Sequence, residues 1–82
     1  MNAEIIRLKG RLRDNEMKAR EFKLRIEGLR DAIRGQLDPY EKIENLKAHR
    51  MAGLAVDLSG LHIDYMELIK EIADIKRDLG ES

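Results

Sequence analysis

The sequence predicts an all-α protein, an antiparallel two-helix hairpin of coiled-coil type that dimerises into a four-helix bundle. Two long stretches carry apolar residues at alternating spacings of three and four, which is the pattern of helices that pack along one seam. Residues that end and start helices lie between these stretches and predict a turn. In addition, one flank of the first seam is basic and the matching flank of the second is acidic.

The amino-acid composition excludes several classes of fold and function. The chain has 82 residues, no cysteine, one proline and equal numbers of basic and acidic side chains, 16 of each. The absence of cysteine excludes a disulfide-stapled fold and a thiolate metal site. A chain this short buries too little surface to enclose a sizeable enzyme pocket. High charge with few aromatic residues is instead typical of long helices and coiled coils.

The first predicted helix covers residues 3–34. Its apolar residues fall at the a and d positions of a heptad repeat, the positions that face a partner helix. Only Asn15 is polar among them, and it either fixes the register of the pair or points to the rim. The a and d residues are Ile5, Leu8, Leu12, Asn15, Ala19, Phe22, Ile26, Leu29 and Ile33.

The predicted turn covers residues 35–38. Gly35 can adopt the left-handed conformation that closes a helix. Asp38 can accept hydrogen bonds from the free amides of a new helix, and Pro39 fits the first helical position. These signals lie within five residues and predict that the chain folds back on itself.

The second predicted helix covers residues 39–79 and ends at Gly80. Ile43 and Leu46 are out of phase with its seam, so the first turns are expected to pack differently. Ser59-Gly60 is the expected place for a kink, and a break there would give a three-helix bundle. An unbroken repeat favours one continuous helix; its members are Leu54, Leu58, Leu61, Tyr65, Leu68, Ile72, Ile75 and Leu79.

The two heptads predict how the helices pair. The intrachain seam is expected to contain Leu8, Leu12, Phe22, Ile26, Leu61, Tyr65 and Leu68. The g positions beside the seam are basic on the first helix (Arg11, Lys18, Arg25) and acidic on the second (Asp57, Asp64, Glu71). A turn near residue 37 brings Arg11 towards Asp64 and Lys18 towards Asp57. Such flanking charges select orientation and partner more than they add stability.

Two features predict self-association. The second helix has an apolar sector wider than one seam needs, because its e and b positions are Ala48, Ala52, Ala55, His62, Met66, Ile69 and Ala73. With the turn near residue 37, its last turns also extend past the end of the first helix. A second copy is expected to cover Ile69, Ile72, Ile75 and Leu79. A dimer is favoured; the sequence leaves open a tetramer and the relative orientation of the hairpins.

These features predict a small non-enzymatic structural protein, which self-associates and presents helix faces to a protein partner in an assembly or adaptor role. No cofactor is expected, because His49 and His62 are too far apart in sequence to share a helix face as metal ligands. No apolar stretch predicts a membrane span or secretory signal, so the expected location is the cytoplasm.

The alternative function is nucleic-acid binding, or regulation through the basic first helix. Residues 1–34 carry ten basic and six acidic side chains. Arg7, Lys9 and Arg13 are the candidate phosphate contacts. The overall neutrality of the chain and the absence of interleaved aromatic residues make nucleic acid the less favoured partner.

Overall fold

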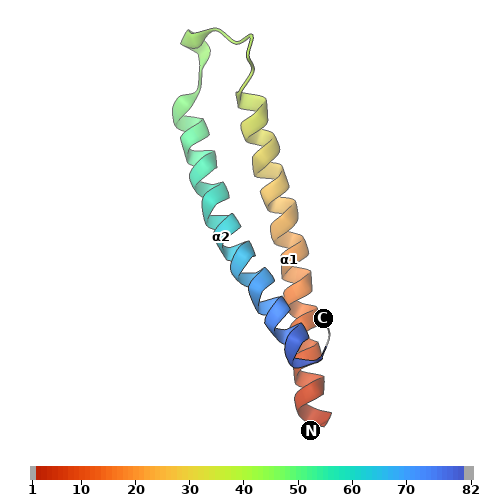
Figure 1. The fold of residues 1–82 in the computed structure, drawn as a ribbon. Helices are drawn as coiled ribbons and strands as arrows, with labels where there is room; N and C mark the ends of the chain where they lie inside the picture. Colours follow the sequence, from red (N-terminus) through yellow and green to blue (C-terminus); the bar gives the residue numbers. More distant parts are fainter. Residues whose placement is uncertain (1, 81–82) are drawn as a thin grey trace.

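The computed structural model describes residues 2–80, which form two long helices joined by a loop (Figure 1). Helix α1 spans Asn2–Gln36 and helix α2 spans Ala48–Asp78. A short 3-10 helix, η1, spans Ile43–Asn45 within the loop. The two α-helices pack against each other, and the described part of the chain contains no strand. The predicted all-α, two-helix architecture is confirmed.

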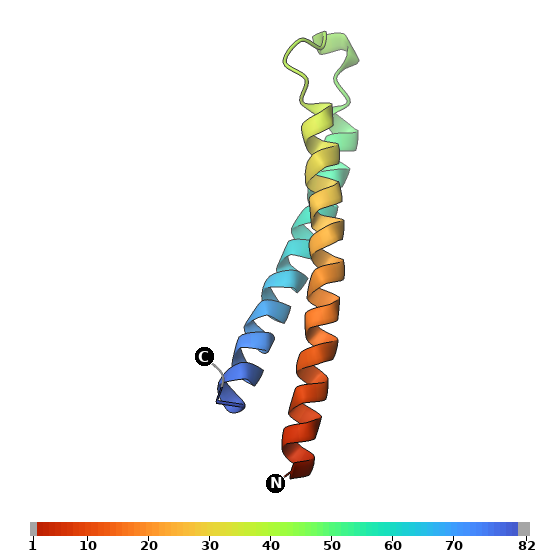
Figure 2. The same ribbon diagram turned by 90° about the vertical axis from the view of Figure 1, so that its right-hand side faces the viewer.

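The molecule is a rod only two helices thick. Its principal extents are 64 × 17 × 16 Å, and its radius of gyration is 18.4 Å. Near the termini α2 passes in front of α1 in Figure 1, whereas Figure 2 shows the two helices side by side there and overlapping near the loop. The helices therefore cross obliquely, as helices that pack along a coiled-coil seam do.

The buried residues lie on one line between the helices. Below one tenth exposure are Asn15, Ala19, Leu68, Ile72 and Ile75. Half-buried residues of both heptads continue this line: Leu8, Leu12, Phe22, Ile26, Leu29, Ile33, Leu54, Leu58, Leu61, Tyr65 and Leu79. Among the described residues none is less than 2% exposed. The hairpin therefore has a seam but no enclosed interior.

Helix α1 ends two residues later than the predicted position 34, at Gln36. Gly35 lies within the helix and does not take the left-handed conformation, which only Gly80 adopts among residues 2–80, with φ 79°. A helix gains one hydrogen bond with each added residue, so it continues until the chain forbids it. Pro39 supplies that limit, because the residue before a proline avoids helical geometry.

Helix α2 begins at Ala48, not at residue 39, because residues 37–47 form a loop. Asp38 accepts the predicted amide hydrogen bond, from Tyr40 N to its Oδ1 at 2.9 Å, but this bond closes a turn and not a helix. The out-of-phase residues Ile43 and Leu46 are 80% and 45% exposed. A helix over residues 39–47 would bury little apolar surface, and helices without such packing are marginal in water.

Helix α2 is continuous through Ser59–Gly60, so the three-helix alternative is wrong. The helix ends at Asp78, one residue before the predicted position 79, and Gly80 follows with the positive φ expected of a glycine that closes a helix. The amides of Leu79 and Gly80 donate to the carbonyls of Ile75 and Arg77, both at 3.0 Å. These bonds satisfy carbonyl groups of the last turn, which otherwise lack partners.

The predicted overhang of the second helix is wrong. Asp78 lies beside Glu4 and Leu8, and the N-terminal end of α1 extends past α2 (Figure 1). The connection is longer than the predicted four-residue turn, so each residue of α1 meets a residue further along α2. Ile72 and Ile75 are consequently buried against α1, at 8% and 3% exposure.

Ile75→Ala tests the assignment of the seam. Removing this side chain, which is 3% exposed, is expected to lower the free energy of unfolding by about 2 kcal/mol. Ile6→Ala is the matched control, because Ile6 is 70% exposed, and its expected effect is within about 0.5 kcal/mol. Urea unfolding followed by circular dichroism measures both; equal effects would contradict the assignment.

Candidate interaction surface

Charged residues link the two helices along one side of the seam. Arg11 Nη2 donates a hydrogen bond to Glu71 Oε1 at 2.8 Å, joining α1 to α2. Both side chains are about half exposed, at 52% and 47%. An ion pair this exposed adds little to stability. Its value is that it ties one position on α1 to one position on α2.

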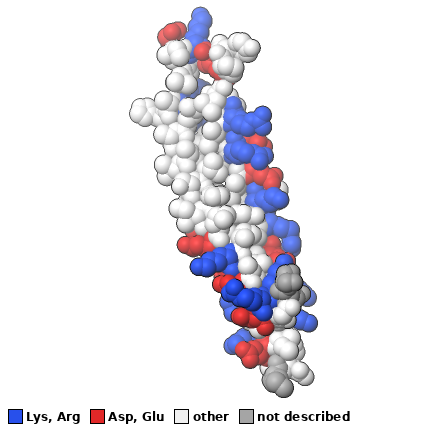
Figure 3. Space-filling view, viewed as in Figure 1, with Lys and Arg blue, Asp and Glu red and all other residues white. Residues whose placement is uncertain are grey.

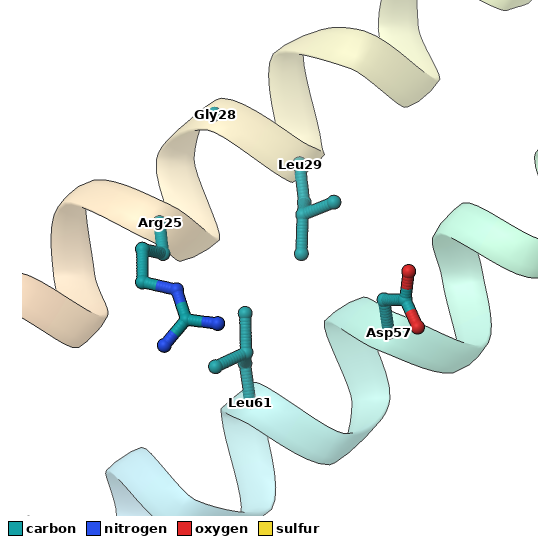
Figure 4. Close-up of a pocket in the computed structure, with 5 residues that line it drawn as sticks. All are labelled: Arg25, Gly28, Leu29, Asp57 and Leu61. Carbon is teal, nitrogen blue, oxygen red and sulfur yellow. The ribbon is translucent and has the colours of Figure 1, made fainter.

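This pair shows that the helices are aligned one heptad away from the predicted register. The expected partner of Arg11 was Asp64, which instead lines a groove with Lys18. The expected partner of Lys18 was Asp57, which lines another groove with Arg25 (Figure 4). A shift of seven residues leaves each a, d and g position in an equivalent place. Basic residues therefore still face acidic ones.

The groove beside Arg25 is open. Figure 4 shows Leu29 and Leu61 pointing towards each other between the helices, with Arg25 on one side and Asp57 on the other. The structure records no ion pair between this arginine and this aspartate within residues 2–80.

Glu71 and Asn15 form the polar part of the seam. Asn15 is 8% exposed, so its side chain lies in the seam and not on the rim. The Arg11 guanidinium holds the pKa of Glu71 below its ordinary value of 4.5, and the Asn15 amide lowers it further. The Asn15 Nδ2 atom is buried, and within the described chain it has no partner at hydrogen-bond distance. The amide therefore influences the carboxylate without being fully satisfied by it.

Figure 3 shows a wide uncharged surface that includes α2. The e, b and f positions between residues 52 and 69 form what we term the α2 face. All its members are exposed, including Val56 at 70%, Ile63 at 56% and Met66 at 50%. The α2 face comprises Ala52, Ala55, Val56, Ser59, His62, Ile63, Met66 and Ile69.

Sequence reasoning found the e and b positions of this face but missed Val56 and Ile63. Both are at f positions, seven residues apart, and that spacing is the signal that would have identified them. Of the predicted dimer contacts, Ile69 is 37% exposed and Leu79 is half-buried. Ile72 and Ile75 are buried against α1, at 8% and 3% exposure, and their contact with a second chain stays a prediction.

The other candidate surfaces are smaller or more charged. The loop exposes Leu37, Tyr40 and Ile43, with Tyr40 93% exposed. Arg7, Lys9 and Arg13 are exposed on α1, and the ion pairs found in residues 2–80 do not involve them. Phosphate binding by these three residues stays a prediction.

No helix in the described part of the chain combines the length and apolar character needed to cross a bilayer. The same residues contain no group of three or more side chains placed to hold a metal ion. The chain matches no protein-family model, and comparisons with curated proteins and with solved structures give no significant match. Its function is therefore inferred from its own residues.

Charge exchange between the helices tests the register. Arg11→Glu places two carboxylates together and is expected to lower Tm at low salt, where exposed charges are least screened. Adding Glu71→Arg restores the opposite-charge pair and is expected to recover Tm. The double variant Arg11→Glu with Asp64→Arg is the control. If Tm recovers in this control and not in Arg11→Glu with Glu71→Arg, the register predicted from the sequence is correct.

Acid titration tests the environment of Glu71. Because folding lowers its pKa, the contribution of its carboxylate is full above about pH 4.5 and is lost as pH falls through the lower folded value. The Tm difference between the wild type and Glu71→Gln is thus expected at pH 7 and is expected to shrink as the pH falls below about 4.5. Glu67→Gln, one turn away, is the control, and a difference that grows with acidity would contradict the assignment.

Proposed function

We propose that this chain is a non-enzymatic interaction protein that self-associates through the α2 face, forming a dimer whose two hairpins make a four-helix bundle. The observation that carries the proposal is the exposed, uncharged α2 face, which extends over five turns of a helix in a highly charged protein. Such a face contacts a further helix in most folded proteins.

The dimensions of the hairpin support the proposal that it associates with a second copy. Its accessible surface is 6766 Å², whereas a globular monomer of this mass has roughly 5,000 Å². Its radius of gyration is 18.4 Å, against roughly 12 Å for a compact chain of this length. Chains of this size rarely have enough core to be stable alone, and without disulfides or metals they commonly oligomerise.

A second copy packed along the whole hairpin offers the area that a stable interface needs. One broad side of a body 64 × 17 × 16 Å has a projected area of roughly 1,000 Å², of which the α2 face covers less than half. A standard interface buries about 800 Å² on each partner. Each large apolar side chain that becomes fully buried contributes roughly 1.5–3 kcal/mol. Val56, Ile63, Met66 and Ile69 from each copy would supply the centre of this interface.

Apolar matching favours contact of α2 with α2. The outer face of α1 exposes Met17 and Leu24 among charged residues such as Arg20, Glu21 and Glu27, so it would oppose an uncharged surface poorly. A two-fold axis lets the same face cover itself, which is how most homodimers are built. The charged outer side of α1 would then stay in water, where a protein partner could bind in an assembly or adaptor role.

Sedimentation equilibrium at 1–100 μM tests this proposal. The wild type is expected to be dimeric at the upper end of the range, and its Tm is expected to fall on dilution. Met66→Glu, which places a charge in the α2 face, is expected to raise Kd at least tenfold while the hairpin stays helical.

Met17→Glu is the matched control, because Met17 and Met66 are both 50% exposed but lie on different helices. This variant is expected to associate like the wild type. A wild type that stays monomeric throughout the range would refute the proposal. Equal association of the two variants would refute the assignment of the face.

A further inference from the structure

His62 is the only member of the α2 face whose side chain can change charge near neutral pH. It lies at an e position, on the side of α2 that borders α1. There it lines an open groove between the helices, together with Ile26, Arg30, Ala55, Leu58 and Ser59. Most of this lining is aliphatic.

The charged groups around His62 disfavour a second positive charge. Arg30 of α1 shares its groove, and the Nε atom of Arg30 is paired with the neighbouring Asp31 at 3.3 Å. One heptad earlier on α1, Lys23 occupies the equivalent e position, and Glu27 at the adjoining b position is the nearest acidic residue by the helical repeat. No carboxylate lines the groove within residues 2–80.

The acidic residues of α2 lie on another side of that helix. Asp57 and Asp64 are at g positions, where they share grooves with Arg25 and Lys18 on the far side of the seam. Glu67 lines the same groove as Asp64. These carboxylates therefore do not compensate a proton on His62, and the aliphatic groove would not solvate the charged ring once it is covered.

We infer that self-association through the α2 face requires a neutral imidazole at His62, so that the assembly dissociates as the pH falls below neutrality. The inference rests on the proposed function, because a second copy is what removes water from this groove. In the isolated hairpin the ring is exposed to water. In the dimer, both copies would bury a cation beside Arg30.

The test compares the dimer Kd at pH 7.5 and pH 5.5 by sedimentation equilibrium at constant ionic strength. A histidine in water gains its proton near pH 6.5, so excluding one proton from each of two copies raises Kd by about a hundredfold over this interval. The interval lies above the range in which exposed carboxylates titrate. The Arg11–Glu71 pair is therefore unaffected by it.

Two variants separate the role of His62 from general effects of acid. His62→Gln cannot be protonated, and its Kd is expected to change little between the two pH values. His49→Gln removes the other histidine, which lies in the first turn of α2 and outside the α2 face, and this variant is expected to show the full wild-type dependence.

The outcomes distinguish this inference from the proposed function. A wild-type dimer with the same Kd at both pH values would overturn the inference and leave self-association intact. A pH dependence of Kd that persists in His62→Gln would have the same consequence. A wild type that is monomeric at pH 7.5 would overturn both. A hundredfold change that disappears only in His62→Gln would support both.

Discussion

The single seam between α1 and α2 is the constraint on which the rest of this structure depends. Two helices meet along a line, so a residue in the seam is covered from one side by the other helix and from the other sides only by its neighbours. Even Ile75, the most buried side chain, keeps 3% of its surface exposed. Each helix must still place its remaining large apolar residues in water: Ile5, Ile6, Met17 and Leu24 on α1, and Val56, Ile63, Met66 and Ile69 on α2. The helices differ in that those of α2 lie together on an uncharged face, whereas charged residues separate those of α1.

Register is the second property that the seam alone does not determine. A heptad seam is nearly unchanged by a slip of seven residues, and so is the sign of the charges beside it. The loop selects one alignment, since residues 37–47 leave the helix path and reduce the length of α2 available for pairing. Asn15 supplies a second constraint, because a buried amide is costly wherever no polar group lies nearby. In the observed register Asn15 lies near Glu71, whose carboxylate binds Arg11, while the Asn15 Nδ2 atom has no hydrogen-bond partner among the described residues.

The sequence predicted the helical positions better than it predicted where helices begin and end. The periodic residues from Leu8 to Leu79 lie in or beside the seam because helical geometry fixes their spacing once a helix forms. The start of α2 was misplaced because the capping signals at Asp38 and Pro39 describe a local preference, which a turn satisfies as well as a helix does. What decides between the two is packing, and Ile43 and Leu46 remain 80% and 45% exposed. The same error in loop length moved the register and produced the false overhang.

Two glycines in α2 are not accounted for by the packing of the isolated hairpin. Gly53 and Gly60 lie in the interior of a continuous helix, where glycine is less favourable than alanine by about 1 kcal/mol each. A Cβ atom added at either position would meet nothing within 4 Å, so packing inside the hairpin does not require its absence. Both adjoin the α2 face at c positions, and small residues on a helix surface allow a second helix to approach closely. Packing within one hairpin therefore does not explain why glycine is present at these two positions. A second copy packed on the α2 face would explain it, because glycine would let the two helices approach closely.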